Sequence, residues 1–495
     1  MATISSALQS AGTLWDVLTG PPAESTAIIL PETDTRVTYG QLRAQIQEMA
    51  GALAALGVKP GERVATSLPN GLAAIVSFVA ASMAGTAAPL NPGYRQEEVE
   101  FYLEDTSAKL LLVPAEGMDD AKAAAKAKGV PVYVLETDAS GYCRIAGAPL
   151  GTAPAVDPEG VALVLHTSGS TGRPKRVPIK HRNLAASTRN IAATYELSTS
   201  DVALCVMPLF HVHGLVASTI STLATGGTLI VPAKFNALSF WKTVRDYKVS
   251  WYSAVPTIHS MLLARAGDTR PDGAEGLRFI RSCSAALPPE MMTKMETVFG
   301  APVLEAYGMT EASHQMASNP RPPRAHKGGS VGPATGIQIG IMDGSGKLLP
   351  QGERGEVVIK GPNVVDGYEN NPEANASSFT DGWFRTGDQG YLDEEGYLFL
   401  TGRLKEMINR GGEKIGPREI DEVLLAHPKV NEAVAFGIPH KTWGEEVAAA
   451  VTLKEPATEQ EILAFCKERL ADFKMPKKLF IVEAIPRTAT GKIQR

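Results

Sequence analysis

The side chains best suited to chemistry stand in one short segment, Thr167 to Lys175, with the sequence Thr-Ser-Gly-Ser-Thr-Gly-Arg-Pro-Lys. Hydroxyls and a lysine alternate there with glycines, whose backbone N–H groups can approach an anion closely. The segment follows an apolar run, Val161 to Leu165, that is typical of a buried strand. Pro174 stands where a Walker A loop needs its Gly-Lys-Ser/Thr, which excludes that loop. We therefore expect a phosphate-binding loop of another kind, in preference to a flexible Ser/Gly turn.

The composition is that of an ordinary globular protein. The chain has 495 residues, which is too many for one hydrophobic core, and 44% of them are hydrophobic and 20% charged. A net charge of −5 gives no electrostatic reason to expect a nucleic-acid partner. The four cysteines stand far apart, without the spacing of a metal site or a disulfide framework, which favours a reducing compartment.

The elements that must position the loop alternate between strand-like and helix-like segments. Thr38 is placed to cap a helix whose apolar residues run from Leu42 to Leu53. The uncharged stretch Gly71 to Leu90 is long enough to raise the question of a membrane span, but its Ala, Ser and Pro content predicts a buried helix followed by a strand. Further strands are predicted at 64–68, 110–113 and 132–135, and helices at 96–103 and 119–128. This alternation is typical of a largely parallel sheet covered by helices.

The alternation resumes after the loop. Strands are predicted at 203–207, 228–231, 251–255, 279–283 and 303–306, and helices at 212–223, 257–266 and 288–299. From Gly336 the pattern changes to short hairpins, which predicts a small β subdomain. The last part has a compact pattern of its own, with helices at 415–427 and 459–470 and strands at 430–437, 447–453 and 478–482. We expect it to form a separate domain.

Five segments in this order carry a family resemblance: Thr167–Lys175, Tyr307-Gly-Met-Thr-Glu311, Arg385-Thr-Gly-Asp388, Gly402–Glu419 and Thr488–Lys492. With them, nearly the whole chain resembles the adenylate-forming superfamily of acyl-CoA synthetases, luciferases and peptide-synthetase adenylation domains. The resemblance implies a reaction in two steps. A carboxylate attacks the α-phosphate of ATP to give an acyl-adenylate and pyrophosphate, and a thiol, usually that of CoA, then displaces AMP.

The resemblance also implies the domain organisation. We expect an α/β protein whose large N-terminal domain, 1–402, has two βαβ-type subdomains and a small β subdomain at about 336–402. A hinge at 403–405, which contains Lys405, and a small mobile α+β domain at 406–495 should follow. Family members rotate this last domain between the two steps. They also usually continue past the position of Arg495, so a peroxisomal signal beyond it stays open beside the expected cytoplasmic location.

The resemblance assigns a role to each nucleotide-binding motif. The β- and γ-phosphates should be held by Thr167, Ser168, Gly169, Ser170, Thr171, Gly172 and Lys175. Thr310 resembles the family's phosphate contact and Glu311 its Mg²⁺ ligand, and a carboxylate oxygen suits that hard cation. Tyr307 offers its ring to adenine, with the backbone of Glu305 and Ala306 beside it. Asp388 can accept from both ribose hydroxyls, and Arg403 can donate to the same sugar.

Two more groups of residues should act in turn. Lys492 resembles the family's C-terminal lysine, whose ammonium bridges the carboxylate and the α-phosphate in the first step. For the thioester step, the loop from Asn409 to Lys414 should replace it, and its Gly412 allows a close approach to the thiol channel. Several relatives carry a different residue at the position of Lys414, which leaves the individual roles in this loop open.

The segments expected to form the acid pocket are unusually polar. They are Pro208–Gly214, Arg281–Ala285 and Ala312–His314, and they contain three histidines, several serines and an arginine. Pockets for fatty or aromatic acids are lined mainly by apolar side chains, so this composition suits a small acid with a second polar end. Within the family these segments most resemble those of oxalate:CoA ligases, with malonyl-CoA synthetases next.

Strand alternation narrows the choice within these segments. On a strand Arg281 would face away from Ser284, so we expect Ser284, with His213 and His314, to bind the distal carboxylate. A helix N-terminal cap is the competing interpretation of His213. His211 resembles the family's gate between the acyl and thiol sites.

Together these residues predict an ATP- and Mg²⁺-dependent ligase that joins a small acid, oxalate first, to CoA. Malonate, then a coumarate-like or short aliphatic acid, are the alternative substrates, and an adenylation module that loads a carrier protein is the alternative of another class. The expected partners are ATP, the acid and CoA, without a nucleic acid or a membrane span. Monomer and homodimer both remain open.

Overall fold

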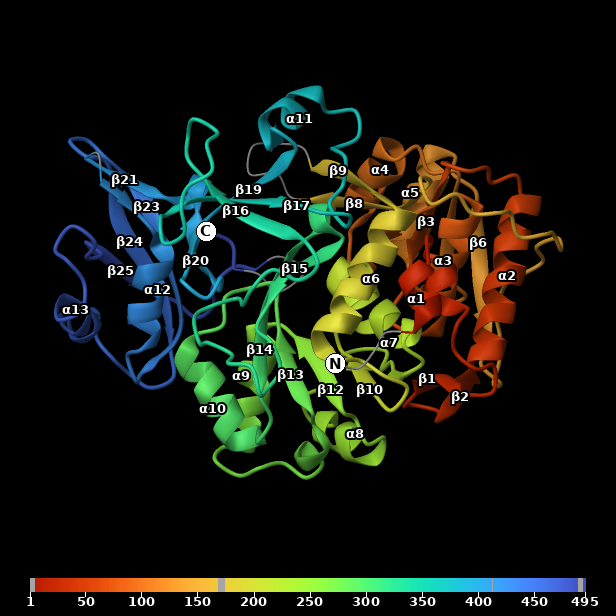
Figure 1. Cartoon of the computed structure of the whole chain (residues 1–495), viewed down its shortest axis with the longest axis horizontal. Helices are drawn as coiled ribbons and strands as arrows, with labels where there is room; N and C mark the ends of the chain where they lie inside the picture. Colours follow the sequence, from red (N-terminus) through yellow and green to blue (C-terminus); the bar gives the residue numbers. More distant parts are fainter. Residues whose placement is uncertain (1–4, 168–173, 412, 488–492) are drawn as a thin grey trace.

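The structure is a computed structural model that describes residues 5–167, 174–411, 413–487 and 493–495 (Figure 1). Two large sheets with their helices occupy the right and centre of the view. The last elements of the chain, from β21 (Ile408–Arg410) to β25 (Lys478–Ile481) with α12 (Pro417–Leu425) and α13 (Glu459–Lys467), lie at the left. The predicted α/β class is confirmed, because both large sheets are mainly parallel and packed against helices.

The N-terminal sheet has seven strands in the order β7-β6-β5-β3-β4-β8-β9. They are β3 (Arg63–Ser67), β4 (Thr86–Leu90), β5 (Leu110–Pro114), β6 (Val132–Thr137), β7 (Cys143–Ile145), β8 (Val161–Thr167) and β9 (Lys175–Lys180). Only the edge strands β7 and β9 are antiparallel to their neighbours. The sequence patterns do not predict β9, and its pairing places Lys175 opposite Thr167. The two ends of the expected phosphate loop are therefore held side by side.

The helices of this sheet agree with their predicted positions. They are α2 (Tyr39–Ala55), α3 (Leu72–Ala84), α4 (Gln96–Asp105) and α5 (Asp119–Lys128). The predicted cap of α2 is confirmed, because Gln41 N donates to Thr38 Oγ1 at 3.2 Å and Thr38 N donates to Gln41 Oε1 at 2.9 Å. Every residue of α3 except the half-buried Ala73 is buried, so the uncharged stretch is a core helix. In the part of the chain that the structure describes, no helix combines the length and apolar character needed to cross a bilayer.

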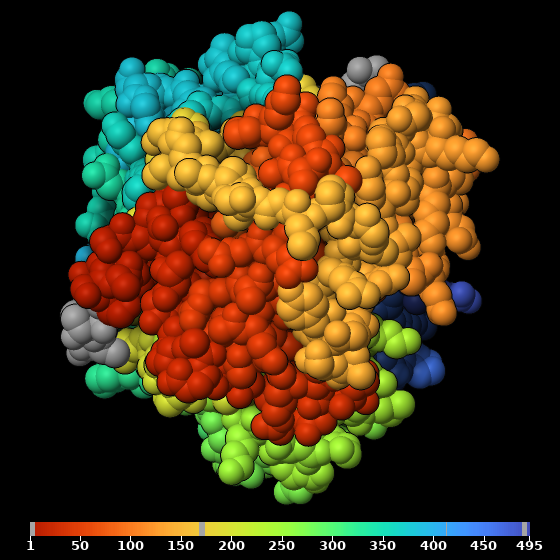
Figure 2. Space-filling model, turned by 90° about the vertical axis from the view of Figure 1, so that its right-hand side faces the viewer, coloured from red at the N-terminus to blue at the C-terminus, as the bar shows by residue number. Residues whose placement is uncertain are grey.

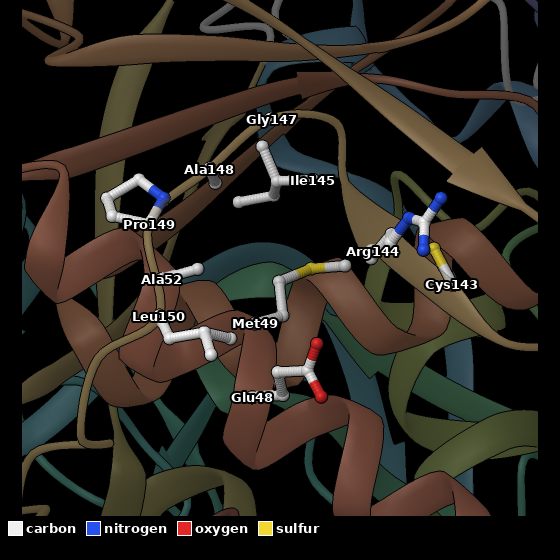
Figure 3. Close-up of a pocket in the computed structure, with 10 residues that line it drawn as sticks. All are labelled: Glu48, Met49, Ala52, Cys143, Arg144, Ile145, Gly147, Ala148, Pro149 and Leu150. Atoms are coloured by element: carbon white, nitrogen blue, oxygen red, sulfur yellow. The ribbon is translucent and has the colours of Figure 1, made fainter.

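The segment that follows β7 covers part of the N-terminal face. In Figure 2 it is the gold chain lying across the red surface of the first residues. The approach is close, because a Cβ on Gly51 would lie 2.2 Å from the carbonyl oxygen of Gly151. Beside it, α2 and Cys143–Leu150 line a hollow of about 290 Å³ (Figure 3). This hollow lies at the β7 edge, away from the β8–β9 edge, and contains none of the predicted site residues.

The second large sheet has eight strands in the order β15-β14-β13-β12-β10-β11-β1-β2. They are β1 (Thr26–Leu30), β2 (Thr35–Thr38), β10 (Val202–Cys205), β11 (Thr228–Ile230), β12 (Trp251–Ala254), β13 (Phe279–Ser282), β14 (Val303–Met309) and β15 (His314–Ser318). The hairpin β1–β2 is not predicted by the sequence patterns, and it joins this sheet from far along the chain. The strands from β1 to β14 along this order are parallel. Their carboxyl ends therefore meet at one edge, where α/β sheets bind ligands.

The helices around this sheet include two that are missing from the sequence-based prediction. They are α6 (His181–Tyr195), η2 (His213–Ile220), α7 (Ser221–Ala224), α8 (Phe240–Asp246), α9 (Pro256–Ala266) and α10 (Pro289–Phe299). Helices α6 and α8 are the two not predicted, and α6 packs against β8 and β9 of the first sheet and β15 of the second (Figure 1). Short helical segments are α1 (Ser6–Ser10), η1 (Asp16–Leu18), η3 (Ala274–Gly276) and η4 (Thr310–Ala312).

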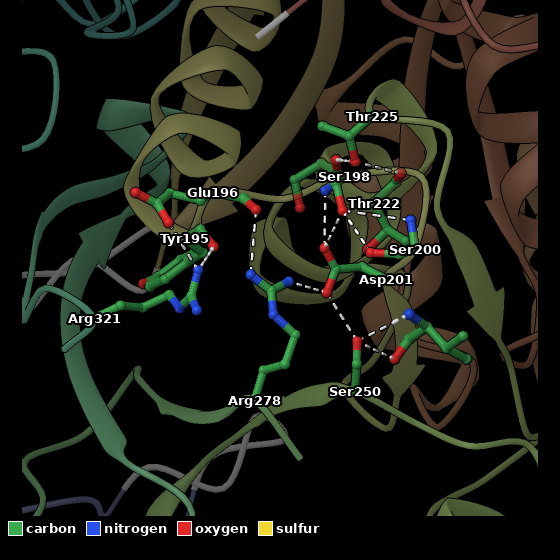
Figure 4. Close-up of polar contacts among 12 residues, drawn as sticks. Tyr195, Glu196, Ser198, Ser200, Asp201, Thr222, Thr225, Ser250, Arg278 and Arg321 are labelled. Carbon is green, nitrogen blue, oxygen red and sulfur yellow. Dashed lines mark hydrogen bonds and ion pairs between the residues drawn. The ribbon is translucent and has the colours of Figure 1, made fainter. Parts of the chain in front are cut away.

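A buried carboxylate fixes the other ends of these parallel strands (Figure 4). Asp201 precedes β10, and it pairs with Arg278, which precedes β13. It also accepts hydrogen bonds from Ser250 Oγ at 2.9 Å and Ser198 N at 2.8 Å. Since Ser250 precedes β12, one side chain aligns the starts of three strands. Their opposite ends are thereby aligned as well.

Two smaller sheets complete the chain. The first contains β16 (Gln338–Met342), β17 (Gly355–Lys360), β18 (Phe379–Thr380), β19 (Trp383–Leu392) and β20 (Leu398–Arg403), with α11 (Pro372–Ser378). The second contains β21 (Ile408–Arg410), β22 (Glu413–Ile415), β23 (Val430–His440), β24 (Gly444–Leu453) and β25 (Lys478–Ile481), with α12 (Pro417–Leu425) and α13 (Glu459–Lys467). Between them lies η5 (Leu404–Glu406), which contains Lys405. The elements agree with the predicted hairpins and α+β unit, and the mobility of that unit stays a prediction.

Candidate active site

The predicted metal and phosphate residues lie at the tip of a hairpin. Strands β14 and β15 are antiparallel, and Thr310 and Glu311 form the η4 turn between them. Ser313 and His314 then have φ of 51° and 111°, which are uncommon values for residues with a side chain. The turn is held from outside, because Asn363 Nδ2 donates to Ala312 O at 2.8 Å and to Gln315 O at 3.0 Å. Strained backbone kept in place in this way is typical of functional sites.

The residues expected at the base and ribose form a connected chain. The Tyr307 hydroxyl donates to Asp388 Oδ2, and Asp388 Oδ1 pairs with Arg403 Nε at 2.9 Å. Burial, together with the Asp388 charge, raises the pKa of the Tyr307 phenol well above its usual value. Asp388 and Arg403 face each other in the β19–β20 ladder, and this pair forms one end of that ladder. The structure thus brings three of the predicted nucleotide residues together.

The phosphate end gathers groups from three distant segments. Burial raises the pKa of the Glu311 carboxyl, and the nearby charges of Arg403 and Lys175 partly offset this. Burial also lowers the pKa of Lys175, and the charge of Lys405 adds to the effect. Lys175 is therefore close enough to both Glu311 and Lys405 to be influenced by their charges, as expected for groups around one polyanion.

Several predicted residues lie outside the described residues. They are Ser168, Gly169, Ser170, Thr171, Gly172, Gly412 and Lys492. Within the thioester loop, Lys414 is an exposed residue of β22, opposite Asn409 on β21. Arg410 of the same loop pairs with Glu446 at 2.6 Å.

The predicted acid-binding residues lie around one buried polar cluster. His213 Nδ1 is 3.0 Å from Ser284 Oγ, and His213 Nε2 is 2.6 Å from Ser253 Oγ. His213 begins the π-helix η2, and both of its ring nitrogens contact serines of other segments, so the competing capping interpretation is wrong. His211 makes the local contact instead, since its Nδ1 accepts from His213 N at 3.2 Å. π-Helical turns occur frequently at functional sites.

Arg281 belongs to this cluster, which corrects the prediction from strand alternation. Its Nη1 lies 3.4 Å from His213 Nε2, and its Nη2 lies 3.2 Å from His314 Nε2. Alternation does not apply up to Ser284, because β13 ends at Ser282 and Ser284 has φ of 73°. That left-handed residue turns the chain back, so Ser284 and Arg281 contact the same histidine. A charged arginine inside a short strand that begins with Phe279 and Ile280 was the available signal in the sequence.

The remaining donors of Arg281 are also satisfied. Its Nε donates to Tyr195 OH at 2.8 Å, its Nη1 to Ser253 Oγ at 3.0 Å and its Nη2 to Gln315 Oε1 at 3.0 Å. Tyr195 ends α6 and Ser253 lies in β12, so several elements position this guanidinium. The sequence patterns miss Tyr195 and Ser253, and neither carries a motif that could have indicated it.

Gly308 explains how the pocket and the nucleotide motif come so close. A Cβ at this position would lie 2.3 Å from His314 O and 2.8 Å from His314 Nδ1. Any side chain on Gly308 would push His314 away from the cluster. The glycine of the Tyr-Gly-Met-Thr-Glu motif therefore allows the acid pocket to form directly beside Thr310.

Glu305 is buried beside the expected adenine site. Its Oε1 accepts from Leu287 N at 2.9 Å, its Oε2 has no hydrogen-bond partner among the described residues, and its backbone oxygen accepts from Asn319 N at 2.9 Å. Burial raises the pKa of this carboxyl to about 7, with the charge of Arg418 acting in the opposite direction. The adjacent Ala306 pairs with Ser318 across the β14–β15 hairpin.

Comparison with known proteins agrees with this geometry. The AMP-binding enzyme family matches residues 15–369, and the AMP-binding enzyme C-terminal domain matches residues 419–492. An oxalate–CoA ligase of Arabidopsis thaliana is 47% identical over 473 residues, which cover 93% of this chain and 92% of that protein. An oxalate–CoA ligase of Saccharomyces cerevisiae is 44% identical over 516 residues, which cover 96% of this chain and 94% of that protein.

A solved structure gives the same result for the fold. The o-succinylbenzoate coenzyme A synthetase MenE of Bacillus subtilis, in complex with ATP and a magnesium ion, has a TM-score of 0.84 and 31% identity, and the match covers 97% of each chain. Because the first family match spans most of the sequence, the protein belongs to the AMP-binding enzyme family and is an AMP-forming acid–thiol ligase, as predicted.

Proposed function

We propose that the protein is an oxalate–CoA ligase that uses ATP with Mg²⁺ and releases AMP and pyrophosphate. Two relatives with this name are 44% and 47% identical to the chain over the aligned residues. The observation that carries the choice of acid is the polar cluster around Arg281. The four cysteines are buried and unpaired, which supports the proposed cytoplasmic location.

The charge balance of the cluster favours an acid with a second carboxylate. Arg281 is fully buried, and no Asp or Glu of the described residues lies within ion-pair distance of it. A buried charge without a counterion costs several kcal/mol, so an anion that binds beside it is strongly favoured. A fatty acid would leave this charge uncompensated.

The hydrogen-bond network also indicates which atoms would donate to that anion. Arginine has only donors, so the Nε2 atoms of His213 and His314 that face Arg281 are acceptors. We assign the proton of each neutral ring to Nδ1 on this basis. His213 can then donate to Ser284, whose hydroxyl proton can turn to a carboxylate. We propose that Ser284, His213 and His314, with the field of Arg281, hold the second carboxylate of oxalate.

In the first step, an oxygen of the reacting carboxylate would attack the α-phosphorus of ATP. The bond from this phosphorus to the bridging oxygen breaks, and pyrophosphate leaves. Tyr307, with the backbone of Glu305 and Ala306, would contact adenine, and Asp388 and Arg403 would bind the ribose. The 167–175 segment and Thr310 would bind the phosphates, and Lys492 would stabilise the charge that develops at the α-phosphate.

The donor set at the phosphate end fits Mg²⁺. No three His, Cys, Asp or Glu side chains converge at one point in the described ranges, so Glu311 would be the principal protein ligand. Mg²⁺ is commonly held by one or two carboxylates together with substrate phosphates and water. When bound, the ion supplies positive charge that offsets the charge of the phosphate oxygens.

In the second step, the sulfur of CoA would attack the acyl carbon. The bond to the AMP oxygen breaks, the thiol proton is lost, and oxalyl-CoA forms. We propose that the 406–495 domain turns about the hinge at 403–405, so that Lys492 leaves and the loop with Gly412 and Lys414 arrives. His211 would separate the acyl and thiol sites.

A screen of acids tests this function. Pyrophosphate release should be measured with ATP, Mg²⁺ and CoA for oxalate, malonate, hexanoate and coumarate, with mass spectrometry of the thioester. We expect the highest kcat/KM for oxalate, followed by malonate. A preference for hexanoate or coumarate would contradict the proposal, as would transfer to a carrier protein but not to CoA.

A further inference from the structure

We propose that Tyr368 is a positioning residue that holds both Glu311 and Lys175 for the metal-bound triphosphate, a role that rests on the ATP site proposed above. Its hydroxyl donates to Glu311 Oε1 at 2.8 Å. Lys175 Nζ lies 4.5 Å from the centroid of its ring. Tyr368 stands between β17 and α11, outside the motifs that carry the family resemblance. One aromatic side chain therefore contacts the acidic and the basic group expected at the same end of ATP.

The backbone of Tyr368 is fixed by the side chain of Asn375. Tyr368 N donates to Asn375 Oδ1 at 2.7 Å, and Asn375 Nδ2 donates to Tyr368 O at 2.9 Å. Tyr368 is buried, with 8% of its surface exposed, and its ring meets Phe384 edge-on, with centroids 6.3 Å apart. The side chain consequently has little freedom to move away from its two partners.

The segment around Tyr368 is also tied to both partners through the backbone. Val365 N donates to Glu311 O at 2.9 Å, and Glu369 N donates to Arg176 O at 3.0 Å. Since Arg176 directly follows Lys175, the two bonds connect this segment to the η4 turn and to the start of β9. Figure 1 shows the same arrangement, with α11 and its preceding loop beside β9.

Each contact has a separate physical effect. A hydrogen bond to one carboxylate oxygen restricts the rotation of the Glu311 carboxylate, so that its second oxygen keeps one direction. The ring face attracts the Lys175 ammonium and limits where this long side chain can place its charge. Holding both groups before ATP arrives reduces the ordering that binding requires.

Ligand binding separates this role from mere packing. AMP has no β- or γ-phosphate, so its binding should depend on Tyr307, Asp388 and Arg403 but not on Tyr368. Equilibrium binding of Mg²⁺–ATP, of ATP with EDTA and of AMP should be measured by calorimetry on the full chain. No acid is present, so the enzyme does not turn over.

Two substitutions separate the hydroxyl from the ring. In Tyr368→Phe we expect the Kd of Mg²⁺–ATP to rise about tenfold, because a charge-assisted hydrogen bond is lost. The Kd values of ATP with EDTA and of AMP should stay within about twofold of those of the wild type. In Tyr368→Leu we expect the affinity for ATP in the presence of EDTA to fall about threefold as well, because Lys175 loses its aromatic contact.

Tyr397 offers a matched control. Lys327 Nζ lies 4.2 Å from its ring centroid, and its hydroxyl donates to Ala325 O at 2.5 Å, but it precedes β20 at the far end of the β19–β20 hairpin. Tyr397→Phe should leave all three affinities unchanged.

The outcome of Tyr368→Phe decides the proposal even if Tyr368→Leu does not fold. An unchanged Kd for Mg²⁺–ATP would overturn it, as would an equal loss for AMP. If the wild-type protein bound no Mg²⁺–ATP at all, the proposed function itself would be wrong.

Discussion

The imidazole rings of His213 and His314 stack with their centroids 5.3 Å apart, although they come from the start of η2 and the start of β15. Both rings turn Nε2 toward the same guanidinium, that of Arg281. Two imidazole rings beside one buried cation form a pocket that favours an anion and disfavours an apolar chain. This arrangement is the physical basis of the predicted substrate.

Removing a donor from the pocket should affect the acid more than the nucleotide. We expect His314→Ala and Ser284→Ala each to lower kcat/KM for oxalate tenfold to a hundredfold, or about 1.5–3 kcal/mol, because a desolvated carboxylate loses a hydrogen bond. The KM for ATP should change little. Arg281→Met should have at least as large an effect.

Arg278→Met is the matched control for Arg281, because Arg278 precedes the same strand and pairs with Asp201 at its other end. It should lower thermal stability without changing the order of acid substrates. Full oxalate activity in both alanine variants would contradict the assignment of the pocket.

Loss of Lys492 should separate the two half-reactions. We expect Lys492→Ala nearly to abolish pyrophosphate release, while thioester formation from a supplied acyl-adenylate stays near that of the wild type, because the lysine acts only in the first step. Lys467→Ala, at an exposed position of α13, is the control and should preserve both steps. Equal losses in the two half-reactions would show that the assigned role is wrong.

The 406–495 domain should move as a body between the steps. Spin labels at Leu238, which is exposed on the N-terminal part, and at Glu468, beside α13, would report on this motion. We expect their separation to change when an acyl-adenylate analogue is exchanged for AMP with CoA, because Lys492 and Gly412 must serve one site in turn. A separation that is the same in all ligand states would count against domain rotation.

Glu305 should make stability depend on pH. Its folded-state pKa of about 7 lies above the value of about 4.3 for an exposed glutamate. The folded state therefore binds this proton more tightly, and the resulting stability is lost as the pH rises through about 7. Relative to Glu305→Gln, the wild type should lose up to about 3 kcal/mol between about pH 4 and pH 8.

Urea unfolding of the wild type and of Glu305→Gln across this range would measure the effect. The amide of this variant keeps an oxygen that can accept from Leu287 N, so the comparison isolates the titrating proton. Parallel stability curves for the two proteins would contradict the raised pKa.

Much of the molecule followed from local sequence. The α2 helix could be predicted with its Thr38 cap, and α5 within its observed bounds, because capping and helix propensity act between near neighbours. The motif around Thr310 and Glu311 indicated the nucleotide site, since the residue types needed to bind phosphate and a hard cation stand next to each other in the chain.

Tertiary structure decided what depends on distant contacts. Arg281 joins the acid pocket only because Ser284 turns back at positive φ and because α6 and β12 supply Tyr195 and Ser253. Strand alternation could not show this, since a period of two holds only while the strand continues. Likewise, nothing near Tyr368 in the sequence indicates Glu311 or Lys175. Packing between segments, rather than local propensity, brings these three side chains together.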